Sequence, residues 1–241
     1  MLHFINIKMY NKVKCKCIIG GNMGYTYTYQ EIKNDLNKAI SEGGKVILGR
    51  PDKNKGFEYY YLLVVPEHEV GNPESNTIVM DCLNYNSEEG QMESSETAER
   101  FYKRLFDNET IDYTEEDKQA ENAMVQRLGR SANICGRHSL NTFGRPTMVP
   151  IIPAKKDILY GDKFPQELRP GIAKDLAPQI EAMFEDARKQ FEIVTGREAS
   201  NQLIMFGHSS SASFGNNFSM LYPEKIAALQ LRWGRMLGAS D

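Results

Sequence analysis

The sequence lacks the long apolar runs of a membrane protein. No continuous apolar stretch approaches the roughly 20 residues that a membrane-spanning helix needs. The N-terminal segment, MLHFINIKMYNKVKCKC, also lacks the continuous apolar core of a secretory signal peptide. We therefore expect a cytoplasmic protein with no membrane partner.

An excess of basic charge is missing as well. The 29 lysines and arginines are outnumbered by 32 aspartates and glutamates, and the net charge is −3. This balance argues against a nucleic-acid partner. The hydrophobic content of 41% over 241 residues is that of a soluble globular chain, within the range of a single α/β domain.

Cysteine and histidine are scarce, with four of each. Cys15 and Cys17 are too close in sequence for an ordinary disulfide, and no Cys/His pair has zinc spacing, so we expect no metal. The glycine-rich stretch 20–24 lacks the spacing of a dinucleotide fingerprint, and the residues after it alternate like a strand. We interpret it as a hairpin turn, with a phosphate-binding loop as the less favoured alternative, and expect no cofactor.

Apolar patterns predict alternating strands and helices along most of the chain. Strands are expected near 59–65, 77–83, 146–153, 202–206 and 226–231, and helices near 30–40, 98–105, 115–128 and 175–194. This alternation predicts an α/β fold with a mainly parallel sheet covered by helices on both faces. Residues 58–241 form the expected core, and residues 1–57 are an N-terminal part of uncertain placement.

The positions of proline and glycine bear on three of these predicted elements. Pro150 lacks a backbone N–H, which argues on physical grounds against a central strand at 146–153. Pro178 is expected in the first turn of a helix capped by Asp175. Gly129 is expected to end the helix that begins near Glu115.

The chemistry of the chain concentrates in residues 201–231. A short apolar strand leads directly into Gly207-His208-Ser209-Ser210-Ser211, and a helix pattern follows until Tyr222-Pro223. A serine on a tight strand-to-helix turn has small residues two positions before and two positions after it, because larger side chains would collide there. Ser209 meets this condition, with Gly207 before it and Ser211 after it. Ser210 does not, because His208 would occupy the crowded position.

This stretch resembles the nucleophile elbow of the α/β-hydrolases, the superfamily of serine esterases and lipases. The chain keeps Gly207, Ser209 and Tyr222-Pro223-Glu224, and it has Ser211 where the family usually has glycine. The resemblance, closest to polyhydroxyalkanoate-depolymerase-type esterases, implies that Ser209 is the nucleophile. It also implies a proline-containing strand near Pro150.

The same resemblance implies an oxyanion hole. One donor would be the backbone N–H of Ser210. The second would come from the loop after the 77–83 strand, where Asn84 or Tyr85 is the candidate. An ordinary strand-to-helix turn at Asn84 and Tyr85 is an equally good interpretation.

The partners that a catalytic serine needs are missing from the sequence. An α/β-hydrolase triad follows the order serine, acid, histidine, yet only 32 residues remain after Ser209 and none is histidine. His208 is adjacent but would point away on a tight turn, and His138 could approach only in an atypical fold. We interpret the chain as the front portion of an α/β-hydrolase, with an open sheet edge that favours self-association.

Two functions fit these observations. The first is a serine esterase acting on a small-molecule acyl ester, with low or absent activity unless a partner supplies the general base. The second is a non-catalytic α/β-hydrolase-fold protein that binds a partner or a small ligand.

Overall fold

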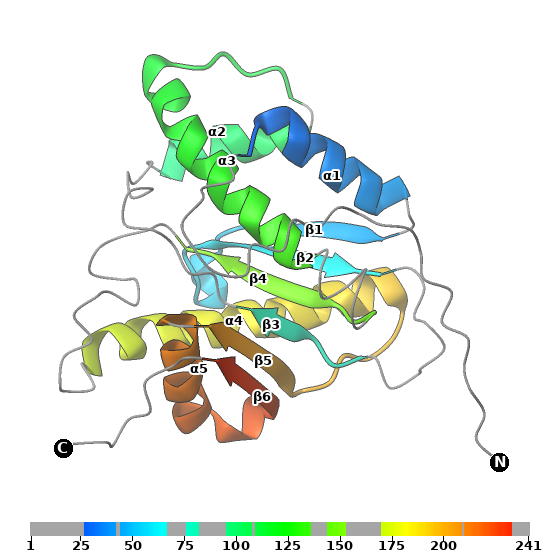
Figure 1. Cartoon of the computed structure of the whole chain (residues 1–241), viewed down its shortest axis with the longest axis vertical. Coiled ribbons are helices and arrows are strands. Elements are labelled where there is room, and N and C mark those ends of the chain that lie inside the picture. Colours follow the sequence, from blue (N-terminus) through cyan, green and yellow to red (C-terminus); the bar gives the residue numbers. More distant parts are fainter. Residues whose placement is uncertain are drawn as a thin grey trace.

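The structure is a computed structural model that describes residues 27–41, 44–66, 76–81, 95–107, 109–135, 144–152, 170–208 and 210–232. In this part of the chain, one six-stranded sheet lies between two groups of helices (Figure 1). The predicted α/β class is confirmed. No helix in the described ranges is both long enough and apolar enough to span a membrane.

The sheet is mixed, so the predicted mainly parallel sheet is confirmed only in part. Its strand order is β1-β2-β4-β3-β5-β6. Strand β2 runs antiparallel to both of its neighbours, whereas β4, β3, β5 and β6 run parallel to one another. The six strands are β1 (Lys45–Gly49), β2 (Tyr60–Val65), β3 (Val79–Asp81), β4 (Thr147–Ile151), β5 (Leu203–His208) and β6 (Ile226–Arg232).

The helices cover the two faces of the sheet in separate groups. One group lies over β2 and β4, and the other lies on the opposite face. The first group is α1 (Tyr29–Ser41), α2 (Ser95–Tyr102) with the π-helical η3 (Lys103–Asp107), and α3 (Glu115–Cys135); the second is α4 (Pro170–Thr195) and α5 (Ser210–Leu221). Short 3-10 turns occur at η1 (Lys53–Lys55) and η5 (Pro223–Lys225).

Two of these helices begin with a reciprocal capping box. At α1, the Thr28 backbone N–H donates to the Glu31 carboxylate at 2.8 Å, and the Glu31 N–H donates to the Thr28 hydroxyl at 3.2 Å. At α3, Thr114 and Asp117 make the same exchange at 2.8 and 3.1 Å. Each box satisfies backbone donors that the first turn leaves free, which explains why the helices begin there.

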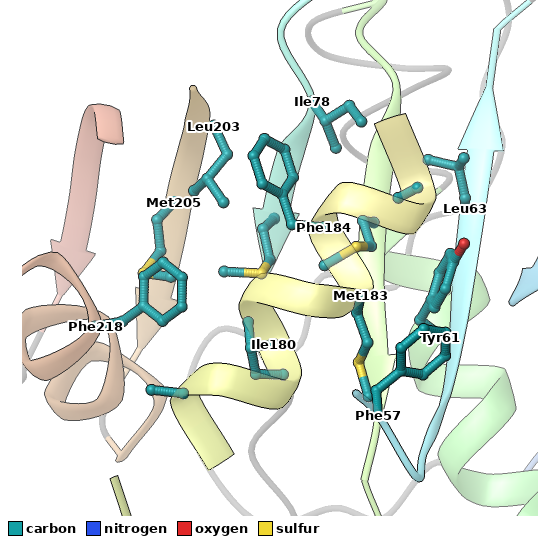
Figure 2. Packing of buried hydrophobic residues seen from close by; sticks show 14 of the residues in the cluster. Phe57, Tyr61, Leu63, Ile78, Ile180, Met183, Phe184, Leu203, Met205 and Phe218 are labelled. Atoms are coloured by element: carbon teal, nitrogen blue, oxygen red, sulfur yellow. The ribbon is translucent and has the colours of Figure 1, made fainter. Parts of the chain in front are cut away.

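The larger core lies between the sheet and α4. Figure 2 shows Ile180, Met183 and Phe184 of α4 packed against side chains from several strands, including Met205 of β5. Phe218 of α5 closes this core at the other end. Because α4 and α5 share one continuous apolar cluster with β5, the position of α5 is set by the same packing that holds the sheet.

The strand and helix bounds confirm one local prediction, the proline-containing strand near Pro150, and correct two others. Strand β4 includes Pro150, which is paired with Tyr61 of β2; the described pairing with β3 stops at Met148, so the missing N–H interrupts no described bond to β3. Helix α3 continues past Gly129 to Cys135. Helix α4 begins at Pro170, so Pro178 lies inside it rather than in its first turn.

Candidate active site

The candidate site is the junction between β5 and α5. β5 ends at His208 and α5 begins at Ser210, so the chain changes from strand to helix across Ser209. Two apolar residues of β5, Leu203 and Met205, are fully buried in the core between the sheet and α4. The aromatic residues of α5, Phe214 and Phe218, bury against the same core. This shared burial forces the sharp turn between them.

Gly207 is the residue on which the sharpness of the turn depends. A Cβ at this position would lie 2.7 Å from the backbone oxygen of Ser211 and 2.8 Å from the backbone nitrogen and Cα of Ala212. These contacts are with backbone atoms, which cannot move aside as the end of a side chain can. The first turn of α5 therefore approaches β5 so closely that only glycine fits at Gly207.

The N-terminal end of α5 supplies the electrostatic environment of the turn. Ser210 is the first residue of the helix, and no acidic residue occupies the first turn. Ser211 follows and is 1% exposed. The first N–H groups of a helix lack partners within the helix and carry the positive end of its dipole. The turn thus favours negative charge near its end.

Strand β3 brings a second segment to this edge of the sheet. It runs parallel to β5, with Met80 paired to Met205 and Asp81 paired to Phe206. Because the carboxyl ends of parallel strands meet at the same edge, the chain leaves β3 beside the β5–α5 turn. The described end of β3, at Asp81, therefore lies next to β5 and close to the turn.

Asp81 is a residue that the sequence prediction passed over as part of a strand. It is 9% exposed and ends β3 in register with Phe206, two positions before His208. The signal for it in the sequence is a carboxylate directly after the apolar run Ile78-Val79-Met80. A buried carboxylate at the ligand-binding edge of an α/β sheet is a candidate functional residue.

Several predicted site residues lie outside the described residues. These are the nucleophile Ser209, the oxyanion candidates Asn84 and Tyr85, and His138. The backbones of Gly207, His208, Ser210 and Ser211 are described: Gly207 and His208 end β5, and Ser210 and Ser211 begin α5. Among the described residues, no cluster of three or more His, Cys, Asp or Glu side chains could hold a metal ion.

Comparisons with known proteins give matches among solved structures only. No protein-family model matches the sequence, and no curated protein matches it significantly. Among solved structures, the chain is similar to naproxen esterase (carboxylesterase NP) from Bacillus subtilis, with 12% identity and a TM-score of 0.36 over 82% of this chain and 47% of the esterase. A putative hydrolase from Legionella pneumophila has 14% identity and a TM-score of 0.39 over 86% of this chain and 49% of the hydrolase.

An arylesterase structure is similar to the same degree, with 12% identity and a TM-score of 0.39 over 86% of this chain and 51% of the arylesterase. The chain therefore spans about half the length of the solved structures that it matches.

Proposed function

We propose that this chain carries the nucleophile turn of a serine hydrolase that acts on small-molecule acyl esters, with Ser209 as the nucleophile. The observation that carries the proposal is the close approach of the two backbones at Gly207. A Cβ atom added to Gly207 would lie only 2.7 Å from the backbone oxygen of Ser211. A turn this tight, between a buried strand and a helix, is the geometry that exposes a serine hydroxyl above an α/β sheet.

The chemistry assigned to the site follows from its backbone. The Ser209 hydroxyl oxygen attacks the ester carbonyl carbon, its proton passes to a general base, and the carbonyl oxygen becomes an oxyanion. In this proposal the backbone N–H of Ser210, the first residue of α5, donates to that oxyanion. Collapse of the intermediate releases the alcohol and leaves an acyl-serine, which water then hydrolyses.

Two further groups belong to the proposal. The second oxyanion donor is a backbone N–H of Asn84 or Tyr85, which come after β3 in the sequence; β3 itself pairs with β5. The general base is His138 or a group from a partner. The second candidate function, a non-catalytic protein that keeps the hydrolase fold and binds a ligand or partner, needs no general base.

Covalent labelling with a fluorophosphonate probe separates the two functions. We expect the wild-type chain to be labelled and Ser209→Ala to remain unlabelled. Ser210→Ala is the matched control, because Ser210 contributes through its backbone N–H, and labelling should persist in that variant. A folded wild-type chain that resists labelling would contradict the catalytic proposal and leave the binding function. Equal labelling of wild type and Ser209→Ala would exclude Ser209 as the nucleophile.

A further inference from the structure

The outer edge of β6 is the most exposed part of the described sheet. β6 is the last strand in the order β1-β2-β4-β3-β5-β6, and no described strand pairs with its outer side (Figure 1). Residues 227–230 of β6 are exposed. A strand edge presents a row of backbone N–H and C=O groups that can pair with another strand.

This edge lacks the features that usually prevent pairing. From Ile226 to Leu231 the strand has no charged residue, no proline and no glycine, whereas natural edge strands are commonly protected by such residues. Leu229 is 42% exposed on the strand itself. Its partner Met205 belongs to the core beneath α5, so Leu229 lies on the α5 face of the sheet.

Exposed apolar side chains gather beside the same edge. Met220 and Leu221, in the last turn of α5, are 64% and 50% exposed. Helix α5 packs on both β5 and β6. Three of the four large hydrophobic residues that stand out as exposed in the described chain therefore belong to the α5–β6 unit, and the fourth is Ile193 of α4. Apolar groups clustered in this way indicate an interaction surface.

The charges at the two ends of β6 indicate which partner fits. Exposed Glu224 precedes the strand and exposed Arg232 ends it. Lys225, between Glu224 and the strand, is already paired with Glu181 and Glu185 of α4 at 3.0 and 2.6 Å. The edge is therefore acidic at its start, neutral in the middle and basic at its end.

We infer that β6 pairs antiparallel with β6 of a second copy of this chain, about a twofold axis perpendicular to the sheet. With Ala228 on the axis, Ala227 faces Leu229 and Ile226 faces Gln230. Each Arg232 then faces Glu224 of the other copy. The same surface meets itself, as a closed twofold dimer requires. Opposite charges meet at both ends, and the two sheets become one continuous sheet with both α5 helices on the same face.

The dimer is independent of the proposed catalytic function, since it uses no residue of the β5–α5 turn. Sedimentation velocity of the full chain over a range of concentrations is the test. We expect a species near twice the 27.4 kDa chain mass. Leu229→Lys should raise the dimer dissociation constant about tenfold or more, because each copy loses a leucine that the dimer buries and gains a charge at the same place.

Ile193→Lys is the matched control, because it makes the same chemical change at a residue that is 73% exposed on α4. Its dissociation constant should equal that of the wild type. A wild-type chain that stays monomeric at its highest soluble concentration would overturn the inference. So would equal weakening by Leu229→Lys and Ile193→Lys, or open-ended association in place of a closed dimer.

A charge swap tests the antiparallel register. Arg232→Glu alone should weaken the dimer about two- to tenfold, because two exposed ion pairs are replaced by two repulsive pairs. Adding Glu224→Lys to the same chain should restore wild-type association. If the double variant is as weak as the single one, Glu224 and Arg232 do not meet, and the antiparallel register is wrong.

Discussion

The two ends of the sheet differ in how completely they are covered. At the β1–β2–β4 end, both faces of the sheet are packed: one against α4, and the other against α1, α2 and α3. At the β5–β6 end, β5 is packed on its α5 face, but Leu229 of β6 is exposed on that face. On the other face, Ile204 and Phe206 are half-buried, and Ala228 and Gln230 are exposed. The first end is a stable scaffold, and the second carries the candidate chemistry and the surface open to a partner.

This difference separates two requirements of the molecule. Stability comes from apolar area that is removed from water on both faces. A site must instead leave reactive groups accessible, and it is placed where the covering stops. If these requirements are separate, a substitution at the scaffold end should lower stability without changing the geometry of the site. The largest effect is expected at the β5–α5 turn.

Gly207→Ala should have the largest effect, because it forces a Cβ into backbone atoms at 2.7–2.8 Å. We expect the free energy of unfolding to fall by about 3 kcal/mol and fluorophosphonate labelling to disappear. Chemical denaturation measures the first change. Gly215→Ala in the same helix is the control. Its Cβ would meet side-chain atoms of Leu231 and Met205, which can move, so we expect a change within about 1 kcal/mol.

Tyr61→Phe tests the scaffold end. The fully buried Tyr61 hydroxyl donates to Asp186 of α4 at 2.6 Å, and burial raises the pKa of Tyr61 well above its ordinary value, so it remains a donor at neutral pH. Its removal leaves Asp186 with Lys55 as its remaining described side-chain donor, at 2.8 Å. We expect a loss of about 1–3 kcal/mol in unfolding free energy, with labelling unchanged.

The control for that change is Tyr59→Phe, which removes a hydroxyl from a half-buried ring on the same side of the molecule. It should alter stability by less than about 0.5 kcal/mol. Loss of labelling in a folded Tyr61→Phe variant would show that the two ends of the sheet are coupled.

We expect Asp117, at the scaffold end, to make the free energy of unfolding sensitive to acid. Arg100 donates to its carboxylate at 2.7 and 3.0 Å, and these hydrogen bonds lower the pKa of Asp117 well below its usual value. A lowered folded-state pKa contributes stability above the unfolded pKa, and this contribution is lost as the pH falls. We therefore expect unfolding free energy to drop below about pH 4.

Asp117→Asn should be less stable than the wild type at neutral pH and should show a shallower drop in acid. Denaturation curves at several pH values between neutral and strongly acidic measure both effects. Glu115→Gln, which removes an exposed carboxylate from the same first turn, is the control and should keep the wild-type acid profile. An Asp117→Asn profile parallel to that of the wild type would contradict this assignment.

The smallest effect is expected at Lys225, which links η5 to α4 through Glu181 and Glu185 just before β6 begins. Its replacement by methionine should lower stability by about 1 kcal/mol or less, because the pairs are partly exposed. The loss should shrink at high salt. Lys118→Met, which breaks a more exposed pair with Glu115, should change stability even less. Equal stability losses in Lys225→Met and Lys118→Met would show that the ion pairs of Lys225 contribute no more stability than an exposed pair.

The sequence was sufficient for the elements whose signals are local. The apolar stripe of α4 and the strand–turn–helix order at residues 203–221 follow from periodicity and from small residues around Ser209. The ends of elements were harder to predict. Gly129 lies inside α3, where a Cβ would meet the ring of Tyr27 at 2.4 Å, so it serves a close packing contact rather than a helix end.

Pro150 and Asp81 show the same limit. Whether a proline fits a strand depends on which of its neighbours the strand pairs with at that residue, and no local pattern contains that information. Asp81 becomes a candidate only once β3 is seen beside β5.

By itself, the sequence determined the class of fold and the strand-to-helix order along residues 203–221, because hydrophobic period and side-chain size act between near neighbours in the chain. The tertiary structure alone decided the direction of β2, the meeting of the β3 and β5 ends, and the exposure of β6. These depend on contacts between segments far apart in the sequence, where the burial of a shared core, rather than local preference, selects the arrangement.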